Sequence, residues 1–155
     1  MRHLNRGRQL SRNTSHRKAL LRNMVTSLIE HGSIETTVAK AKELRSVADK
    51  LVTIGKRAIG KSVADGVHAR RVAASFVRTE SAVAKLFGEI APGFVERAGG
   101  YTRIIQTRVR HGDGAPMAVI EFMPAGAPVS RGSVNPTAPV VKKAIIPETK
   151  ESFGG

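Results

Sequence analysis

Cysteine and tryptophan are absent from the 155 residues of this chain, and aromatic residues make up only 4% of it. Without cysteine there is neither a disulfide nor a thiolate zinc site, and this composition suits the cytoplasm, where we expect the protein to reside. With Tyr101 as the single tyrosine, stacking of nucleic-acid bases on exposed rings is poorly supplied. We therefore expect a small aliphatic core, and phosphate contacts rather than base stacking in any nucleic-acid complex.

Long apolar runs and acidic residues are also scarce. The first apolar cluster, residues 20–29, has helical spacing and is too short for a membrane span, so we expect no signal peptide, no transmembrane segment and no membrane partner. Twelve acidic residues face 26 lysines and arginines, which gives a formal net charge of +14. A chain with this surplus attracts polyanions, and nucleic acid is the first candidate partner.

The positive charge is concentrated at the N-terminus. Residues 1–29 contain seven lysines and arginines and no acidic residue. Six of the seven are arginines, whose planar guanidinium group makes two parallel hydrogen bonds to a phosphate while it stays charged. His3 and His16 lie in the same run and are better suited to phosphate contact than to catalysis. The run predicts contact with RNA or DNA rather than a solvated charge cluster.

Three segments differ in composition. Residues 1–13 carry too little apolar side chain to offset the entropy cost of folding, and we interpret them as a basic nucleic-acid-binding arm. Residues 14–123 hold the periodic apolar patterns and are predicted to form one compact α/β domain, which this chain length also favours. Residues 124–155 contain five of the seven prolines and are predicted to be an extended Pro/Gly-rich tail, held by something outside the chain.

Within the predicted compact domain, helical and strand patterns follow one another. Apolar positions at helical spacing follow Ser15, the expected cap, and end at Gly32. A short β-branched strand, residues 33–37, precedes a second amphipathic helix that fades near Gly55. The remaining elements are expected as helices within 67–77 and 82–90, a helical turn at 94–97, and strands at 102–110 and 117–123 around the turn signal Asp113-Gly114.

Residues 55–62, which read GKRAIGKS, match the P-loop pattern of phosphate-binding NTPases letter for letter. That motif works when a buried strand enters a glycine-rich loop whose amides surround the phosphates, and a helix follows. Here the end of an amphipathic helix precedes the string, and no apolar strand ending in aspartate is available for magnesium. We therefore interpret it as a basic turn between helices and not as a nucleotide site.

Candidate catalytic and metal-binding groups do not assemble into a constellation. The imidazoles show no ligand spacing with each other or with a carboxylate, and the acidic residues are scattered. We therefore expect no enzymatic activity, no metal, no cofactor and no small-molecule substrate. The histidines are His3, His16, His31, His68 and His111.

Several short motifs follow one another along residues 1–122. The N-terminal ones are MRH at 1–3, GRQL at 7–10, SHR at 15–17 and RNM at 22–24. The downstream ones are KAKELR at 40–45, VAKLF at 83–87, RAGGYTRI at 97–104 and APMA at 115–118. Together they closely resemble the motifs of the bacterial large-subunit ribosomal protein family called L-seventeen. The tail after residue 123 extends past the usual end of that family, and residues 55–66 hold more glycine and basic residues than it usually has.

This resemblance implies a compact α+β fold in which helices surround a small mixed three-stranded sheet. It also implies an architectural role: binding of large-subunit (23S) rRNA on the solvent side of the subunit near the polypeptide exit tunnel, beside the ribosomal proteins called L-twenty-two and L-thirty-two. The residues that would contact rRNA are Arg2, His3, Arg6, Arg8, Arg12, His16, Arg17, Lys18, Arg22, Lys40, Lys42, Arg45, Arg97, Tyr101 and Arg103.

A nucleoid-type DNA-binding module is the alternative from another class. It would share the positive charge and the helices, but it normally needs dimer symmetry or a recognition helix, and no such helix stands out in the sequence. The mechanism that we expect is neutralisation of folded rRNA by cationic side chains, with little readout of base sequence.

Overall fold

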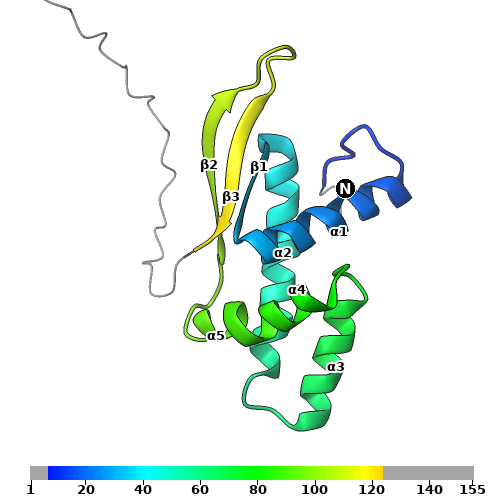
Figure 1. The fold of residues 1–155 in the computed structure, drawn as a ribbon, viewed down its shortest axis with the longest axis vertical. Helices are drawn as coiled ribbons and strands as arrows, with labels where there is room; N and C mark the ends of the chain where they lie inside the picture. Colours follow the sequence, from blue (N-terminus) through cyan, green and yellow to red (C-terminus); the bar gives the residue numbers. More distant parts are fainter. Residues whose placement is uncertain (1–6, 124–155) are drawn as a thin grey trace, which may run out of the picture.

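A computed structural model describes residues 7–123 (Figure 1). Helices and a small sheet form one α+β unit, as the sequence predicts, whereas the first six residues of the expected arm and the whole expected tail lie outside the described residues. The elements are α1 Thr14–His31, β1 Ser33–Thr37, α2 Val38–Ala58, α3 Val63–Ala74, α4 Glu80–Lys85, the π-helical turn η1 Leu86–Ile90, α5 Ala91–Gly93, β2 Thr102–Val109 and β3 Pro116–Phe122.

The sheet is antiparallel throughout, in the order β1-β3-β2. Ile120 of β3 pairs with Ile34 on one side and with Ile104 on the other, both in antiparallel register. The expectation of a mixed sheet is therefore wrong. The two strands that run in the same direction, β1 and β2, are separated by β3, so no parallel pair forms. The β2–β3 hairpin extends away from the helices in Figure 1.

The core is aliphatic, as the composition predicts. Helix α2 packs against β2 and β3 on one side and against α1 and α3 on the others. Its apolar stripe is buried from Ala41 to Gly55 and meets the inward faces of α1, η1 and β3. The largest fully buried side chains are Val25, Leu28, Ile29, Leu44, Val52, Leu86 and Ile120.

The ends of the first two helices differ from the predicted ones. Asn13, rather than Ser15, caps α1, and its side-chain oxygen accepts a hydrogen bond from the backbone N–H of His16 at 2.9 Å. Gly32 ends α1 as expected, in the left-handed conformation with φ of 78°. Helix α2 continues past Gly55 to Ala58, so that glycine is not a helix stop.

Thr26 of α1 is buried and connects two elements. Its hydroxyl donates to the backbone carbonyl of Arg22 at 2.8 Å and accepts from the backbone N–H of Arg78 at 3.1 Å. That second bond fixes the loop after α3 on α1.

Replacing Thr26 with valine keeps the side-chain shape but leaves the Arg78 N–H unsatisfied. A donor that loses its partner in a half-buried place costs about 1–3 kcal/mol of unfolding free energy. Denaturant titration should show this loss for Thr26→Val, while Thr26→Ser, which retains the hydroxyl, should lose less. Equal stability of the valine variant and the wild type would contradict this role of the hydroxyl.

Candidate nucleic-acid interface

The described part of the N-terminal segment makes a tight turn ahead of α1. The backbone N–H of Arg12 donates to the carbonyl of Gln9 at 3.3 Å, and Leu10 and Ser11 between them have φ of 57° and 51°. Two successive non-glycine residues in the left-handed region are an uncommon, energetically costly arrangement. The Arg12 guanidinium supports it by donating to the Leu10 carbonyl at 3.0 Å.

This turn folds back onto the helices rather than extending as an arm. Arg17 of α1 donates to the carbonyl of Arg8 at 3.3 Å. Because residues 7–13 carry few apolar side chains, the sequence predicts that they do not fold. In the structure, hydrogen bonds from arginine side chains hold this segment in place. Between the turn, α1 and α2 lies a hollow of about 350 Å³, lined by Gly7, Arg8, Arg17, Leu21, Glu43, Ser46 and Lys50.

Lys50 was missed by the sequence analysis, although its position gives a usable signal. Lys42, Ser46 and Lys50 follow one another at intervals of four residues, so they share one face of α2. Lys42 and Lys50 are both exposed. The lining of the hollow therefore holds the α2 cation Lys50 as well as Arg8 and Arg17, together with the acid Glu43.

Other predicted contact residues on the helices are open to solvent. His16, Lys18 and Arg45 are exposed, and Lys40 is half-buried at the start of α2. The charge of Arg45 also acts inside the chain: burial raises the pKa of Asp49, and the nearby Arg45 guanidinium opposes that rise. These side chains can reach a phosphate without breaking a side-chain contact that holds the fold.

Arg22 has a structural role instead. Its Nε donates to the backbone carbonyl of Phe76 at 2.8 Å, and its guanidinium lies 6.0 Å from the centroid of the Phe76 ring. Like Thr26, this side chain ties the loop after α3 to α1. The sequence places Arg22 in the basic run but gives no sign of a partner 54 residues away.

Tyr101 is likewise part of the core, with only 3% of its surface exposed. Its ring packs against Phe94 with centroids 5.3 Å apart, and its hydroxyl accepts from Lys56 Nζ at 3.3 Å. Lys56 also donates to the backbone carbonyl of Arg97, a half-buried residue. The ring is therefore unavailable for stacking on a base.

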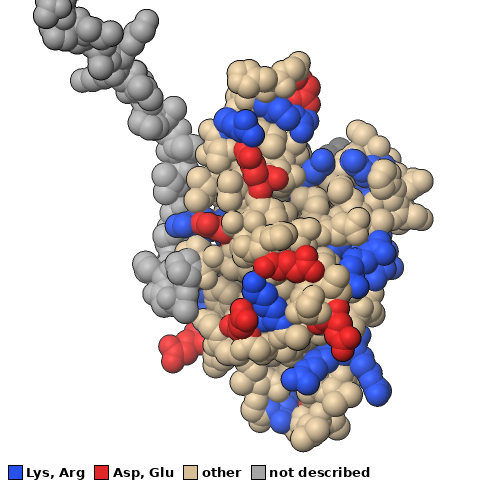
Figure 2. Space-filling view, viewed as in Figure 1, with Lys and Arg blue, Asp and Glu red and all other residues tan. Residues whose placement is uncertain are grey.

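The three ion pairs found within residues 7–123 all lie on the sheet and its hairpin. They join Arg103 to Glu121, Arg108 to Glu35 and Arg110 to Asp113, at 2.5, 3.0 and 2.5 Å. Each arginine there has a carboxylate beside it, so the outer side of the sheet is balanced in charge. In Figure 2, red and blue alternate over the hairpin, whereas blue predominates beside α1 and α3.

Residues 7–31, by contrast, hold five lysines and arginines against the single acid Glu30. Glu30 accepts a hydrogen bond from the Thr79 hydroxyl at 2.7 Å and makes no ion pair with the basic run in the structure. The surplus of positive charge therefore lies on the side formed by the N-terminal turn, α1 and α2. We call this the basic side: Arg8, Arg12, His16, Arg17, Lys18, Lys40, Lys42, Arg45 and Lys50.

The hairpin pair gives a pH-dependent test of the charge-balanced side. Hydrogen bonds from Arg110 lower the pKa of Asp113 to about 2 from its ordinary 3.8. A lowered carboxyl pKa stabilises the folded turn above the unfolded pKa, and this contribution disappears as the pH falls through about 2. Arg110→Gln should move the Asp113 pKa back toward 3.8 in an NMR titration, and an unmoved titration curve would rule out the pair.

The P-loop-like string has the wrong structural context, as expected. It spans the last turn of α2 and the loop before α3, and it ends at Ser62, whose hydroxyl caps α3 by accepting from the backbone N–H of Asp65 at 3.3 Å. No strand enters it.

Among residues 7–123 there is also no group of three or more His, Asp or Glu that could hold a metal ion. None of the helices in that range has the length and apolarity needed to span a bilayer.

Fold and charge together define a small basic α+β protein with one cationic side and one charge-balanced side. A profile of the ribosomal protein L17 family matches residues 20–123. The chain belongs to this family, which confirms the resemblance seen in the motifs.

Three relatives illustrate how far the similarity extends. The large ribosomal subunit protein bL17 of Pelobacter propionicus is 57% identical over 123 residues, which are 79% of this chain and 91% of the relative. The protein of the same name from Desulfotalea psychrophila is 58% identical over 123 residues, 79% of this chain and 90% of the relative. That from Geobacter sulfurreducens is 50% identical over 155 residues, 98% of this chain and 85% of the relative.

Proposed function

We propose that this chain is a non-enzymatic structural component of the large ribosomal subunit in the cytoplasm, where it binds large-subunit rRNA through phosphate contacts. The basic side supplies the contacts, together with the predicted contact residues Arg2, His3 and Arg6 outside the described residues. In keeping with the family resemblance, its place is near the polypeptide exit tunnel, beside the proteins called L-twenty-two and L-thirty-two.

The observation that carries this proposal is the one-sided charge. Charged side chains are paired differently on the two sides of the molecule. Every arginine of the ion pairs on the sheet and its hairpin has its own carboxylate, whereas the basic side has no ion pair among the described residues. Unbalanced cations bind a polyanion by releasing its counterions, without reading its sequence. Folded rRNA, with its dense phosphates, suits such a surface, and the relatives named above are large-subunit proteins.

A DNA-binding module remains the alternative for the same charge, but the fold gives it little support. DNA readers of the helix-turn-helix type insert a recognition helix into the major groove. Helix α3 has two exposed arginines, Arg70 and Arg71, yet its first turns carry the exposed valines Val63 and Val67 and the acid Asp65, which repels DNA phosphates. We therefore favour RNA.

Sedimentation tests the proposal directly. The chain, expressed in its bacterial host with a C-terminal tag, should remain with the large subunit after a wash at high salt, because many phosphate contacts act together with a fixed protein scaffold. Recovery in the free protein fraction, with large subunits of normal sedimentation, would contradict the proposal.

A further inference from the structure

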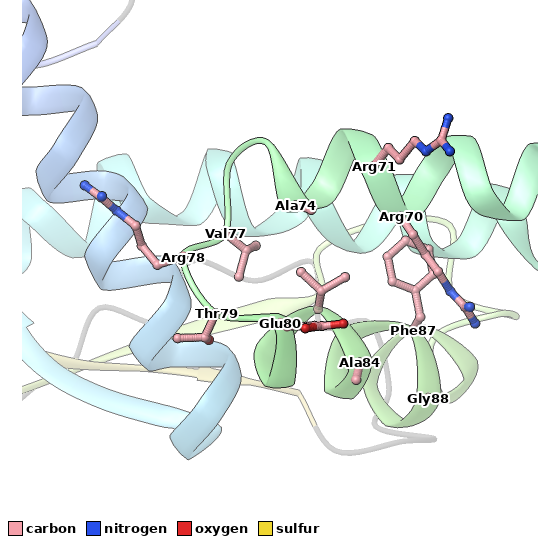
Figure 3. A pocket seen from close by; sticks show the side chains of 11 residues that line it. Arg70, Arg71, Ala74, Val77, Arg78, Thr79, Glu80, Ala84, Phe87 and Gly88 are labelled. Carbon is pink, nitrogen blue, oxygen red and sulfur yellow. The ribbon is translucent and has the colours of Figure 1, made fainter.

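A groove separates α3 from α4 on the side of the molecule next to the basic side. Its volume is about 640 Å³, within the range of pockets that take small ligands. The floor is apolar, with Val77, Val83 and Phe87 as its larger side chains, and Figure 3 shows Val77 directed into the space between the helices. The full lining is Arg70, Arg71, Ala74, Val77, Arg78, Thr79, Glu80, Val83, Ala84, Phe87 and Gly88.

Part of the groove lining places a guanidinium group over an aromatic ring. The Arg70 guanidinium lies 5.8 Å from the centroid of the Phe87 ring, and Figure 3 shows the two side by side. Unstacked RNA bases bind to such surfaces, on aromatic rings or on guanidinium planes. A stacking site is therefore present here, although the scarcity of aromatic residues led us to expect none.

The rim of the groove is basic. Arg71 and Arg78 are exposed and extend outward from the groove in different directions in Figure 3. Glu80 is the single acidic residue in the lining, and its carboxylate can accept hydrogen bonds from base amino or imino groups. Three arginines against one glutamate favour an anionic occupant over a basic protein segment.

The groove also continues the basic side. Arg78 is held on α1 by the bond from its backbone N–H to Thr26 at 3.1 Å, so its side chain projects beside α1. An RNA strand lying along α1 can thus reach the groove without leaving the surface.

Gly88 keeps its part of the groove lining free of a side chain. It lies in a helical turn, where glycine costs about 1 kcal/mol relative to alanine. Yet it has no positive φ, and a Cβ built on it would meet nothing within 4 Å. Nothing inside the described part of the chain requires glycine there, and its place in the groove lining leaves room for a ligand.

We propose that this groove binds an unpaired nucleotide extruded from the rRNA, with its base against Arg70 and Phe87 and the flanking phosphates on Arg71 and Arg78. This proposal rests on the proposed function and adds a second kind of contact to it: the basic side binds by charge, whereas the groove recognises an unstacked base.

Two variants, one of the exposed arginines and one of the ring, distinguish phosphate contact from base stacking in the groove. Arg71→Gln with Arg78→Gln should weaken binding to large-subunit rRNA about tenfold and reduce the slope of log K against log salt by about 1.4–1.8, since two phosphate contacts are lost. Phe87→Leu keeps an apolar side chain but removes the ring. It should weaken binding about fivefold and leave that slope unchanged, because stacking releases no counterions.

The measurement uses the full chain and large-subunit rRNA, with chemical modification of unpaired bases as a second readout. The wild type should protect a base that becomes reactive again in both groove variants, while protection along the basic side persists. Arg108→Gln with Arg110→Gln, which removes the same charge from the hairpin, is the matched control and should change neither readout. Thermal unfolding of each variant checks that the fold is intact.

Failure of the two proposals can be told apart. If the wild type binds rRNA and the groove variants match it in affinity, slope and protected bases, the groove is not a nucleotide site, and a protein occupant becomes the explanation of its apolar floor. If the wild type does not bind rRNA at all, the proposed function fails, and the nucleotide proposal fails with it.

Discussion

Replacing Arg8, Lys18 and Arg45 with glutamine is expected to weaken binding to large-subunit rRNA about 100-fold. None of these side chains makes a hydrogen bond within residues 7–123, and all three are exposed, so the fold should be unaffected. A charged contact to phosphate is worth about 1 kcal/mol or more, and about 1.4 kcal/mol changes affinity tenfold. The slope of log K against log salt should fall by about 2–2.7, since three phosphate contacts are lost.

The matched control for this triple variant removes three arginines from the sheet. Arg103→Gln, Arg108→Gln and Arg110→Gln change the net charge by the same amount, but each of these arginines is already paired with a carboxylate. Affinity should fall less than about threefold, and the salt slope should fall by less than about 1. The control also tests the prediction that Arg103 contacts rRNA. A loss equal to that of the first triple variant would mean that total charge, rather than its placement, governs binding.

Leu44→Ala is expected to have the largest effect on stability. Leu44 lies in the middle of α2 with 0% of its surface exposed, in the cluster that joins α1, α2 and the sheet. Removing its methyl groups leaves a cavity, which costs about 2–5 kcal/mol. For a domain of this size the melting temperature should fall by roughly 10–20 °C.

Two comparisons make the Leu44 result specific. Leu44→Met nearly conserves volume and should cost less than about 1.5 kcal/mol. Val47→Ala, at a half-buried position of the same helix, should cost less than Leu44→Ala, because fewer contacts are lost. Below its melting temperature the Leu44 variant should bind rRNA with unchanged affinity, because the side chains of the basic side lie on the outer faces of the helices, away from the core. A weakened affinity in the folded variant would mean that the core shapes the interface.

Local patterns predicted most of the fold, because the spacing of apolar residues and the residue types that favour turns depend only on neighbouring residues. The strand ending at Thr37, the αL end of α1 at Gly32 and the hairpin at Asp113 follow from such signals. Gly55 shows where a local signal fails. The local pattern predicts that a helix fades there, but a Cβ at Gly55 would lie 2.8 Å from the Cβ of Ala91, so the glycine serves close packing of two helices.

The candidate site was harder to predict, because a cation in a sequence does not reveal its partner. Arg22 and Tyr101 belong to motifs of the predicted interface, yet the structure uses both to hold distant segments together. Arg103 is separated by 18 residues from the glutamate that neutralises it. Arg8 and Lys18 are exposed, as a contact with phosphate requires, and their role in binding rRNA stays a prediction.

The absence of cysteine allows the central claim to be tested by site-directed cleavage of rRNA. A single cysteine introduced at Ser15, exposed on α1, or at Thr107, exposed on β2, can carry an iron chelate that generates hydroxyl radicals next to one face of the molecule. With the protein assembled into the large subunit, the account predicts strong rRNA cleavage from position 15 and weak cleavage from position 107. Equal cleavage from both positions, or stronger cleavage from the sheet, would contradict the claim that the basic side faces rRNA.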